Sequence, residues 1–168
     1  MKRILSAALA MAILAGAGAA EAQGRNRVQI EQGGRGHGVA IAQNGDRNGS
    51  VTVQHGRGHY AQGVQTGYDN FLRMDQYGTR NSATTDQFGE RNLAVTAQEG
   101  LALKAQTSQR GYNNVAGTAQ LGMNNRALTD QAGSNNASAI IQTGNNQDVE
   151  VRQRGTGNIS VVVQSGYN

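Results

Sequence analysis

Residues 120–131 read Gln120-Leu-Gly122-Met-Asn-Asn125-Arg-Ala127-Leu-Thr-Asp-Gln131, and the pattern of this stretch repeats through the chain. The unit is Gln-x-Gly-x-x-Asn-x-Ala-x-Thr-x, and it returns every eleven residues. Its Gln occurs thirteen times in succession, at Gln32, Gln43, Gln54, Gln65, Gln76, Gln87, Gln98, Gln109, Gln120, Gln131, Gln142, Gln153 and Gln164. A Gly follows each Gln two residues later, at Gly34, Gly45, Gly56, Gly67, Gly78, Gly89, Gly100, Gly111, Gly122, Gly133, Gly144, Gly155 and Gly166. An Asn usually stands three residues after that Gly, at Asn48, Asn70, Asn81, Asn92, Asn114, Asn125, Asn136 and Asn158. A spacing kept without insertion from residue 32 to residue 166 predicts a repeat architecture.

An eleven-residue period is compatible with a right-handed helical supercoil or with a stack of strands. The helical alternative conflicts with the composition, because every unit carries a Gly and usually an Asn, and both residues interrupt helices. Between them the chain alternates with a period of two, as in Gln147-Asp-Val149-Glu-Val151-Arg-Gln153, which indicates a β-strand. We therefore expect each unit to form a strand of about six residues and a turn of about four to five residues at Gly-x-x-Asn, where Gly and Asn tolerate positive φ.

Successive strand residues point to opposite sides, so the residues of each unit can be assigned to two faces. The Gln, the residues two and four before it, and the Asn six before it share the inward face. Between the two amides this face carries small or β-branched side chains. Leu72 and Met74 are its bulkiest pair, and we expect them to face small residues such as Ala61 and Gly63.

Two consecutive units are expected to make one rung, which places residues 22 apart directly above one another at about 4.8 Å. Gln then stacks on Gln and Asn on Asn, as in amyloid amide ladders. A repeated segment supports this pairing, since residues 34–37 and residues 56–59 both read Gly-Arg-Gly-His. The predicted fold is all-β, a flat two-sheet β-solenoid of thirteen strands with amyloid-like cross-β stacking. A three-sided solenoid with 33 residues per rung is the competing geometry.

The composition and the N-terminal segment restrict the possible classes of protein. The chain has 168 residues with no Cys, no Pro and no Trp, which excludes a disulfide scaffold and a Cys-type zinc site. Lys2 and Arg3 precede an apolar run of about 15 residues, too short to span a membrane. With the small-x-small site at residues 20–22, this pattern is typical of a secretory signal peptide. We expect residues 1–22 to be removed and residues 23–168 to form one secreted repeat domain.

Catalytic chemistry is not expected from this sequence. We find no Ser, His and Asp constellation, no paired carboxylates and no phosphate-binding loop, so we predict neither an enzyme nor a cofactor. His37, His55 and His59 are a possible metal site, because 22-residue stacking brings His37 and His59 to about 5 Å. No carboxylate repeats in register with these histidines. We therefore favour the interpretation that they are polar substitutes within a ladder over the interpretation that they bind a metal. Arg35 and Arg57 do not extend into a basic stripe, so nucleic acid is not expected as a partner.

The last strand is the candidate docking edge for another strand. Residues 159–164 read Ile-Ser-Val-Val-Val-Gln, an uncharged segment that is β-branched on both faces and typical of steric zippers. The docking residues are Ile159, Val161, Val162 and Val163. At the other end Arg27 and Glu31 place charge on the first strand, which blunts an edge. Outward positions are mostly apolar on the odd strands and polar on the even strands, so we expect the odd sheet to be an interaction face.

The repeated unit resembles the curlin repeat of bacterial curli fibres, and the resemblance covers residues 26–168. It implies a secreted structural subunit that self-assembles into functional amyloid, an extracellular fimbrium for adhesion and biofilm matrix. The stacking ladder would consist of the Gln and Asn residues given above. The resemblance also implies partners: further copies of the chain in a homopolymer, a second curlin subunit, an outer-membrane curli secretion pore, periplasmic accessory proteins, and host or abiotic surfaces. Both the major subunit and the minor, nucleating subunit of the family resemble this chain.

A monomeric extracellular β-solenoid that binds a ligand, such as an ice-binding or adhesin module, is the alternative function. An ice-binding face requires a flat outward array of Thr, whereas Thr85, Thr96 and Thr107 have inward parity. This distribution of Thr favours assembly.

Overall fold

The computed structural model describes residues 24–166, and the expected signal peptide at residues 1–22 lies outside them. Thirteen strands follow in chain order: β1 (Arg27–Arg35), β2 (Gly38–Asp46), β3 (Gly49–Arg57), β4 (Tyr60–Tyr68), β5 (Phe71–Thr79), β6 (Ser82–Glu90), β7 (Leu93–Leu101), β8 (Lys104–Tyr112), β9 (Val115–Met123), β10 (Arg126–Ser134), β11 (Ala137–Asn145), β12 (Asp148–Thr156) and β13 (Ile159–Gly166). One strand per eleven-residue unit is therefore confirmed.

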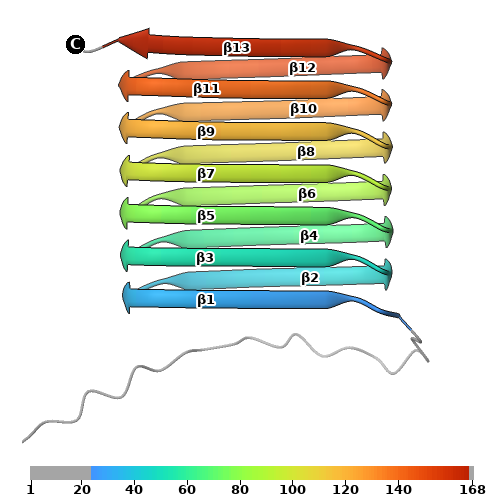
Figure 1. Cartoon of the computed structure of the whole chain (residues 1–168), viewed down its shortest axis with the longest axis horizontal. Helices are drawn as coiled ribbons and strands as arrows, with labels where there is room; N and C mark the ends of the chain where they lie inside the picture. The colour runs from blue at the N-terminus through green and yellow to red at the C-terminus, as the bar shows by residue number, and fades with distance from the viewer. Residues whose placement is uncertain (1–23, 167–168) are drawn as a thin grey trace, which may run out of the picture.

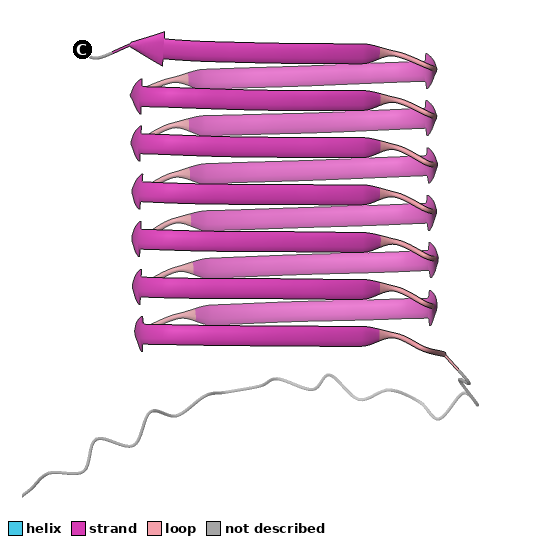
Figure 2. Ribbon diagram, in the orientation of Figure 1, coloured by secondary structure: helices cyan, strands magenta, loops and turns pink. Residues whose placement is uncertain are grey.

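The strands form two parallel sheets that lie face to face (Figures 1 and 2). The odd sheet contains the seven odd-numbered strands in the order β1-β3-β5-β7-β9-β11-β13, and the even sheet contains the six even-numbered strands. Each strand pairs with the strand 22 residues away, as where Gln54 lies beside Gln76. The flat two-sheet solenoid is thus confirmed and the three-sided alternative is wrong. At about 4.8 Å per rung the stack is roughly 31 Å long.

The strands are longer and the connections shorter than the sequence suggested. Twelve strands have nine residues, and two residues join each strand to the next, as at residues 58–59. Pairing continues through the Gly of each unit because that Gly stacks on the Gly of the next rung, as Gly89 does on Gly111. The connections hydrogen-bond between rungs as well: the Arg91 backbone N–H donates to the Tyr68 carbonyl at 2.9 Å. Because their backbone groups bond to the neighbouring rung, the connections between strands can be short.

Positive φ occurs at the Gly and at the residue just before the ladder Asn, rather than at that Asn. Asn135, for example, has a φ of 57°, whereas the ladder residue Asn136 follows it. The other non-Gly residues with positive φ occupy the same place in their units: Arg47, Asp69, Arg80, Arg91, Ala102, Asn113, Asn124 and Asn146. The expectation that the ladder Asn itself adopts this conformation was wrong, because its side chain must enter the interior.

The Gly of each unit is required by the next rung. Gly89 has a φ of 117°, and a methyl group built there would overlap the carbonyl oxygen of Gly111. Any side chain at this place would force two rungs apart. The invariance of Gly through the repeat thus follows from backbone approach as well as from φ.

The interior is narrow and holds small side chains between two amide-lined edges. Its bulkiest pair, Leu72 and Met74, is fully buried with Ala61, and both belong to an apolar cluster at the N-terminal side of the stack. A Cβ atom at Gly63 would lie 2.8 Å from Leu72 Cδ2, so Gly63 supplies the space that Leu72 fills. A second cluster of Ala127, Ile140, Val149 and Val151 lies near the C-terminal end.

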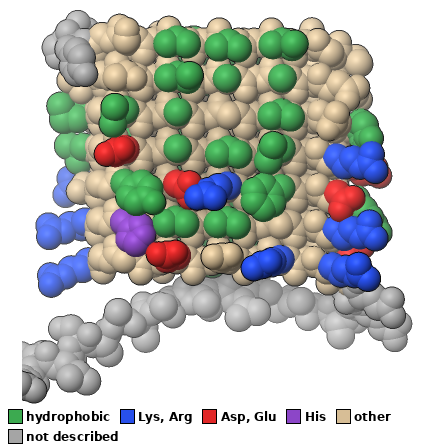
Figure 3. Space-filling view, in the orientation of Figure 1, with side chains coloured by type: hydrophobic (Ala, Val, Ile, Leu, Met, Phe, Trp, Pro, Cys, Tyr) green, Lys and Arg blue, Asp and Glu red, His purple; other side chains and the backbone are tan. Residues whose placement is uncertain are grey.

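The outer faces of the two sheets differ in chemistry. The odd sheet faces the viewer in Figure 3, where apolar side chains gather over the C-terminal strands and charged side chains over the N-terminal strands. From β7 to β13 the central outward columns carry no charge, and their most exposed members are Val95, Val115, Ile141, Ile159, Val161 and Val163. We call this area the apolar half-face. On β5 it ends at an ion pair between Arg73 and Asp75, whose Nε and Oδ2 atoms are 2.7 Å apart.

Candidate functional site: amide ladders and two open ends

Two columns of Gln run through the interior, one at each edge of the sandwich. In each column the side-chain amide donates to the Gln 22 residues later: Gln54 Nε2 lies 2.7 Å from Gln76 Oε1, and Gln87 Nε2 lies 2.9 Å from Gln109 Oε1. The odd column comprises Gln32, Gln54, Gln76, Gln98, Gln120, Gln142 and Gln164. The even column comprises Gln43, Gln65, Gln87, Gln109, Gln131 and Gln153. All thirteen Gln positions of the repeat therefore meet in two continuous chains of hydrogen bonds.

The second amide proton is also satisfied in each Gln from Gln43 to Gln142. Gln87 Nε2 donates to the Phe71 carbonyl at 3.0 Å, and Gln109 Nε2 donates to the Leu93 carbonyl at the same distance. These amides are fully buried, and a buried polar group without a partner costs about 1 to 3 kcal/mol. The ladder thus stabilises an interior that has too little apolar surface to hold together by itself.

A third column consists only of Asn, and its members lie immediately before the odd strands. Asn70 Oδ1 accepts from both the backbone N–H and the side-chain Nδ2 of Asn92, at 3.0 and 3.1 Å. Asn92 Nδ2 donates in addition to the Gly111 carbonyl at 3.1 Å. The column contains Asn26, Asn48, Asn70, Asn92, Asn114, Asn136 and Asn158. Asn26 belongs to it although its unit lacks a preceding Gln and was not among the predicted ladder residues; its parity is the signal that identifies it.

The fourth column, at the start of the even strands, is mixed. It contains His37, His59, Asn81, Leu103, Asn125 and Gln147. The Leu103 N–H donates to Asn81 Oδ1 at 3.0 Å, but the Leu103 side chain offers no acceptor to the next rung. Leu103 is fully buried, so this column exchanges one polar contact for apolar packing.

The two imidazoles, His37 and His59, stack on each other within this fourth column. Their centroids lie 5.0 Å apart, and His59 Nδ1 accepts from the Asn81 backbone N–H at 3.1 Å while its Nε2 lies 3.0 Å from the His55 carbonyl oxygen. Burial lowers the pKa of His59, since charging the ring costs desolvation. His55 points outward beside Glu31, at 3.5 Å. Within residues 24–166 no three metal-ligating side chains come together.

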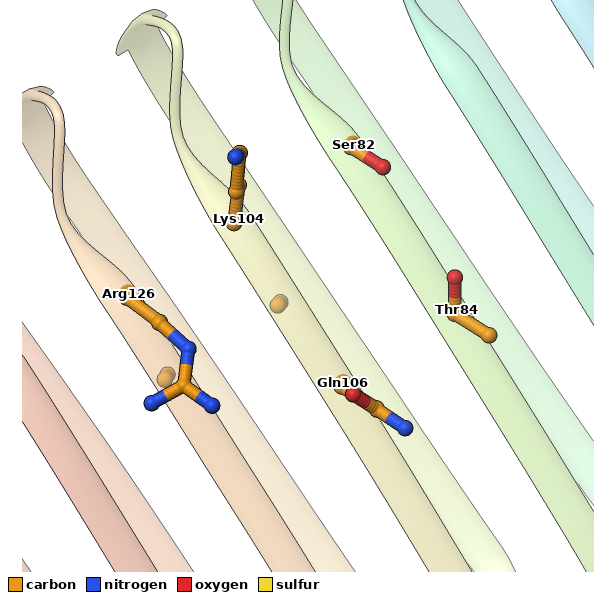
Figure 4. Close-up of a pocket in the computed structure, with 7 residues that line it drawn as sticks. Ser82, Thr84, Lys104, Gln106 and Arg126 are labelled. Carbon is orange, nitrogen blue, oxygen red and sulfur yellow. The ribbon is translucent and has the colours of Figure 1, made fainter.

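Surface hollows are shallow. Figure 4 shows one on the even sheet, about 150 Å³ in volume, lined by Ser82, Thr84, Lys104, Gln106 and Arg126. Arg126 is already paired with Asp148 at 3.0 Å. A groove of about 310 Å³ on the odd face lies over Ala97 and Ala119. Neither hollow combines depth with convergent polar groups, which a small-molecule site requires.

The two ends of the stack are the places where the ladders stop. In the described part of the chain β1, β2, β12 and β13 each have a paired neighbour on one side only. At the N-terminal end the inward-facing Val28 and Ile30 remain 46% and 48% exposed. On the predicted docking strand β13, Ile159, Val161 and Val163 point outward and are well exposed, whereas Val162 packs against the C-terminal cluster.

A family model described as the curlin-associated repeat matches residues 122–155, which supports membership of the chain in the curlin family. No curated protein and no solved structure matches the chain. Among residues 24–166 there is no helix with the length and apolar character needed to cross a membrane. The match and the β-solenoid together indicate a structural, non-enzymatic protein.

Proposed function

We propose that this member of the curlin family is a secreted structural subunit that polymerises end to end into extracellular curli-type amyloid fibres. The family implies self-assembly into fibres. One observation carries the proposal for this chain: hydrogen-bonding ladders run the whole length of the stack and stop at two ends whose strand edges are unpaired.

Another copy of the same chain is the occupant that fits these ends best. Exposed strand edges are templates for further pairing. Each ladder has the same repeat at every rung, so a second copy continues the Gln columns and the Gly columns in register, which a partner of unrelated sequence does not. The predicted docking residues Ile159, Val161, Val162 and Val163 keep their role in this proposal as part of the C-terminal end.

The same proposal includes the cellular route. Residues 1–22 would direct export, residues 23–168 would cross the outer membrane through a curli secretion pore with periplasmic accessory proteins, and the fibre would form on the cell surface. Fibres would then contribute to adhesion to host or abiotic surfaces and to the biofilm matrix. The chain would serve as the fibre subunit or as a nucleator for a second curlin.

A monomeric ligand-binding solenoid is the alternative, and the shallow hollows of both sheets disfavour it. To test between them, we would incubate purified residues 23–168 and record fibre diffraction and dye binding. The proposed function expects fibres with a meridional reflection near 4.7 to 4.8 Å and an equatorial reflection near 10 Å. A chain that stays folded and monomeric at high concentration, with or without added seeds, would contradict it.

A further inference from the structure

The number of strands determines the shape of the two ends. Because thirteen is odd, β1 and β13 both belong to the odd sheet. At the C-terminal end the odd sheet therefore stands half a rung beyond the even sheet, and at the N-terminal end it again stands half a rung beyond it. The two ends are steps of the same kind (Figure 1).

We propose that successive copies in the fibre are related by half a turn about the fibre axis, so that β1 of one copy pairs with β12 of the copy before it and β2 pairs with β13. This inference rests on the proposed function. Stacked without rotation, β1 would meet β13, and the place of one even strand between β12 and the next copy's β2 would be empty. The half turn closes both steps and leaves no gap, because the projecting odd strand of each copy fills the recess of the other.

Charge at the junction favours the half turn. With Gln32 placed over Gln153, Arg27 lies beside Asp148 and Glu31 lies beside Arg152, two pairs of opposite sign. The outward residues of β12 are two acids, Asp148 and Glu150, followed by two bases, Arg152 and Arg154, and Arg152 is also ion-paired with Glu150. Without rotation the same Arg27 and Glu31 would lie beside Ile159 and Val163, where a charge beside an apolar column gains nothing.

The inward residues of the end strands favour the same arrangement. Most central strands carry Ala, Ser or Thr at the two inward positions between the amides, for example Ser50 and Thr52 on β3. The end strands instead carry Val28 and Ile30 on β1, and Val149 and Val151 on β12. The half turn places Val28 over Val149 and Ile30 over Val151.

The second strand pair of the junction continues this apolar interior. On β2 the inward residues are Val39 and Ile41, and Ile41 would lie over Val162 of β13. In the single copy Val39, Ile41 and Val162 are partly exposed. Stacking by half a turn would bury them against each other, which gives a physical reason for bulky apolar residues at both ends.

The half turn has a consequence for the fibre. Each copy would advance it by six and a half rungs, roughly 31 Å, with a full repeat of roughly 62 Å. The apolar half-face would then alternate between the two sides of the filament.

Cross-linking tests the arrangement directly, because the chain contains no Cys. In the half-turn stack Gln29 of one copy lies beside Glu150 of the copy before it, while without rotation it lies beside Val161 of that copy. We would prepare Gln29→Cys with Glu150→Cys in one chain, and Gln29→Cys with Val161→Cys as the matched control. Within one copy the members of each pair lie at opposite ends, so any product of a short bis-maleimide is intermolecular.

If successive copies are related by a half turn, fibres of the first chain should give a series of covalent oligomers, and fibres of the second chain should give unlinked subunits. Efficient linking in the control, or equal linking in both, would overturn the half turn while leaving fibre formation intact. Absence of fibres from the unmodified chain would instead reject the proposed function, so the two failures are distinguishable.

Charge exchange provides a second, independent test in seeded elongation. Arg27→Glu with Glu31→Arg at the N-terminal end should slow addition to unmodified seeds at least about fivefold, since both pairs become like-charged. Adding Asp148→Arg with Arg152→Asp to the same chain restores both pairs, and elongation on its own seeds should recover. Failure of the combined variant to recover, with fibres still formed, would argue for contact between β1 and β13.

Discussion

Gln87 and Gln109 lie on adjacent rungs of the even sheet, and the side-chain Nε2 of Gln87 donates a hydrogen bond of 2.9 Å to Oε1 of Gln109. Both are fully buried, and they continue toward Gln65 and Gln131 at the same spacing. This contact is one link in a chain of identical amides, so its loss affects neighbours on both sides.

Replacing Gln87 and Gln109 together by Ala should therefore destabilise the folded chain. The change leaves Gln65 and Gln131 with one unmade hydrogen bond each, at about 1 to 3 kcal/mol per group. We expect a clearly lower denaturant midpoint, measured by circular dichroism. The outward, exposed Gln106→Ala is the matched control and should leave the midpoint nearly unchanged; equal shifts for both variants would show that the ladder amides are not a source of stability.

Glycine substitutions should separate folding from stacking. Gly89→Ala places a methyl group against the Gly111 carbonyl within one copy and should prevent stable folding, whereas at Gly117 the nearest atom to an added Cβ is the Ser138 carbonyl oxygen at 3.9 Å. Gly117→Ala should be tolerated.

Gly155 is the informative case, because a Cβ atom there meets only Asn158 Nδ2, at 3.8 Å, within one copy. In the proposed fibre the next subunit's Gly34 would cover it. Gly155→Ala should therefore still fold, with a modest loss of stability because the φ of residue 155 is 102°. It should nevertheless elongate seeds poorly. Normal elongation by this variant would show that β12 is not a docking strand.

Stability should depend on pH through His59. Its pKa lies below the ordinary 6.5 because the ring is buried. The unfolded chain then binds more protons than the folded one between the two pKa values, so stability is complete above about pH 7 and declines as pH falls through 6.5 toward the folded pKa. Protonation also removes the Nδ1 acceptor that Asn81 uses.

His59→Asn should abolish this decline while keeping an acceptor for the Asn81 N–H. Urea midpoints between pH 7.5 and 5.5 measure the effect, with His55→Asn, at a partly exposed outward position, as control. A decline of the same size in the His59 variant would assign the proton uptake to another group.

The C-terminal docking edge should control elongation. Val161→Lys with Val163→Lys places two charges on β13, where the next strand is expected to pair, and should lengthen the lag of assembly several-fold. The matched control is Val95→Lys with Ala97→Lys, which occupies the same two outward columns on the central strand β7. If dye-binding curves show the same lag for both pairs, β13 has no special part in docking.

The apolar half-face should mediate contact between filaments. Val95, Val115 and Ile141 are 36%, 40% and 42% exposed, and a contiguous apolar area of this kind marks an interaction surface. Changing all three to Ser should leave filaments intact but separate in electron micrographs. Thr84, Gln106 and Glu150 changed to Ser on the even sheet should leave bundling as it was, and bundles lost from both triples would reject a specific role for the odd face.

Much of this molecule could be predicted from the sequence because its information is local and repeated. Alternation around each Gln identified the strands and their inward faces, and the recurrence of Gly-Arg-Gly-His at residues 34–37 and 56–59 indicated 22-residue rungs. The stacking of Gln on Gln then follows, since parallel in-register strands bring identical positions together.

The tertiary structure alone decided how the rungs fit. It showed that pairing extends through Gly89 to two-residue connections, and that positive φ falls on Asn135 while Asn136 turns inward. It also placed Leu72 in the space above Gly63 and the ring of His59 beneath the Asn81 N–H. These features depend on the approach of backbones and side chains that lie far apart in the sequence, and a local alternation of apolar and polar residues carries no information about that distance.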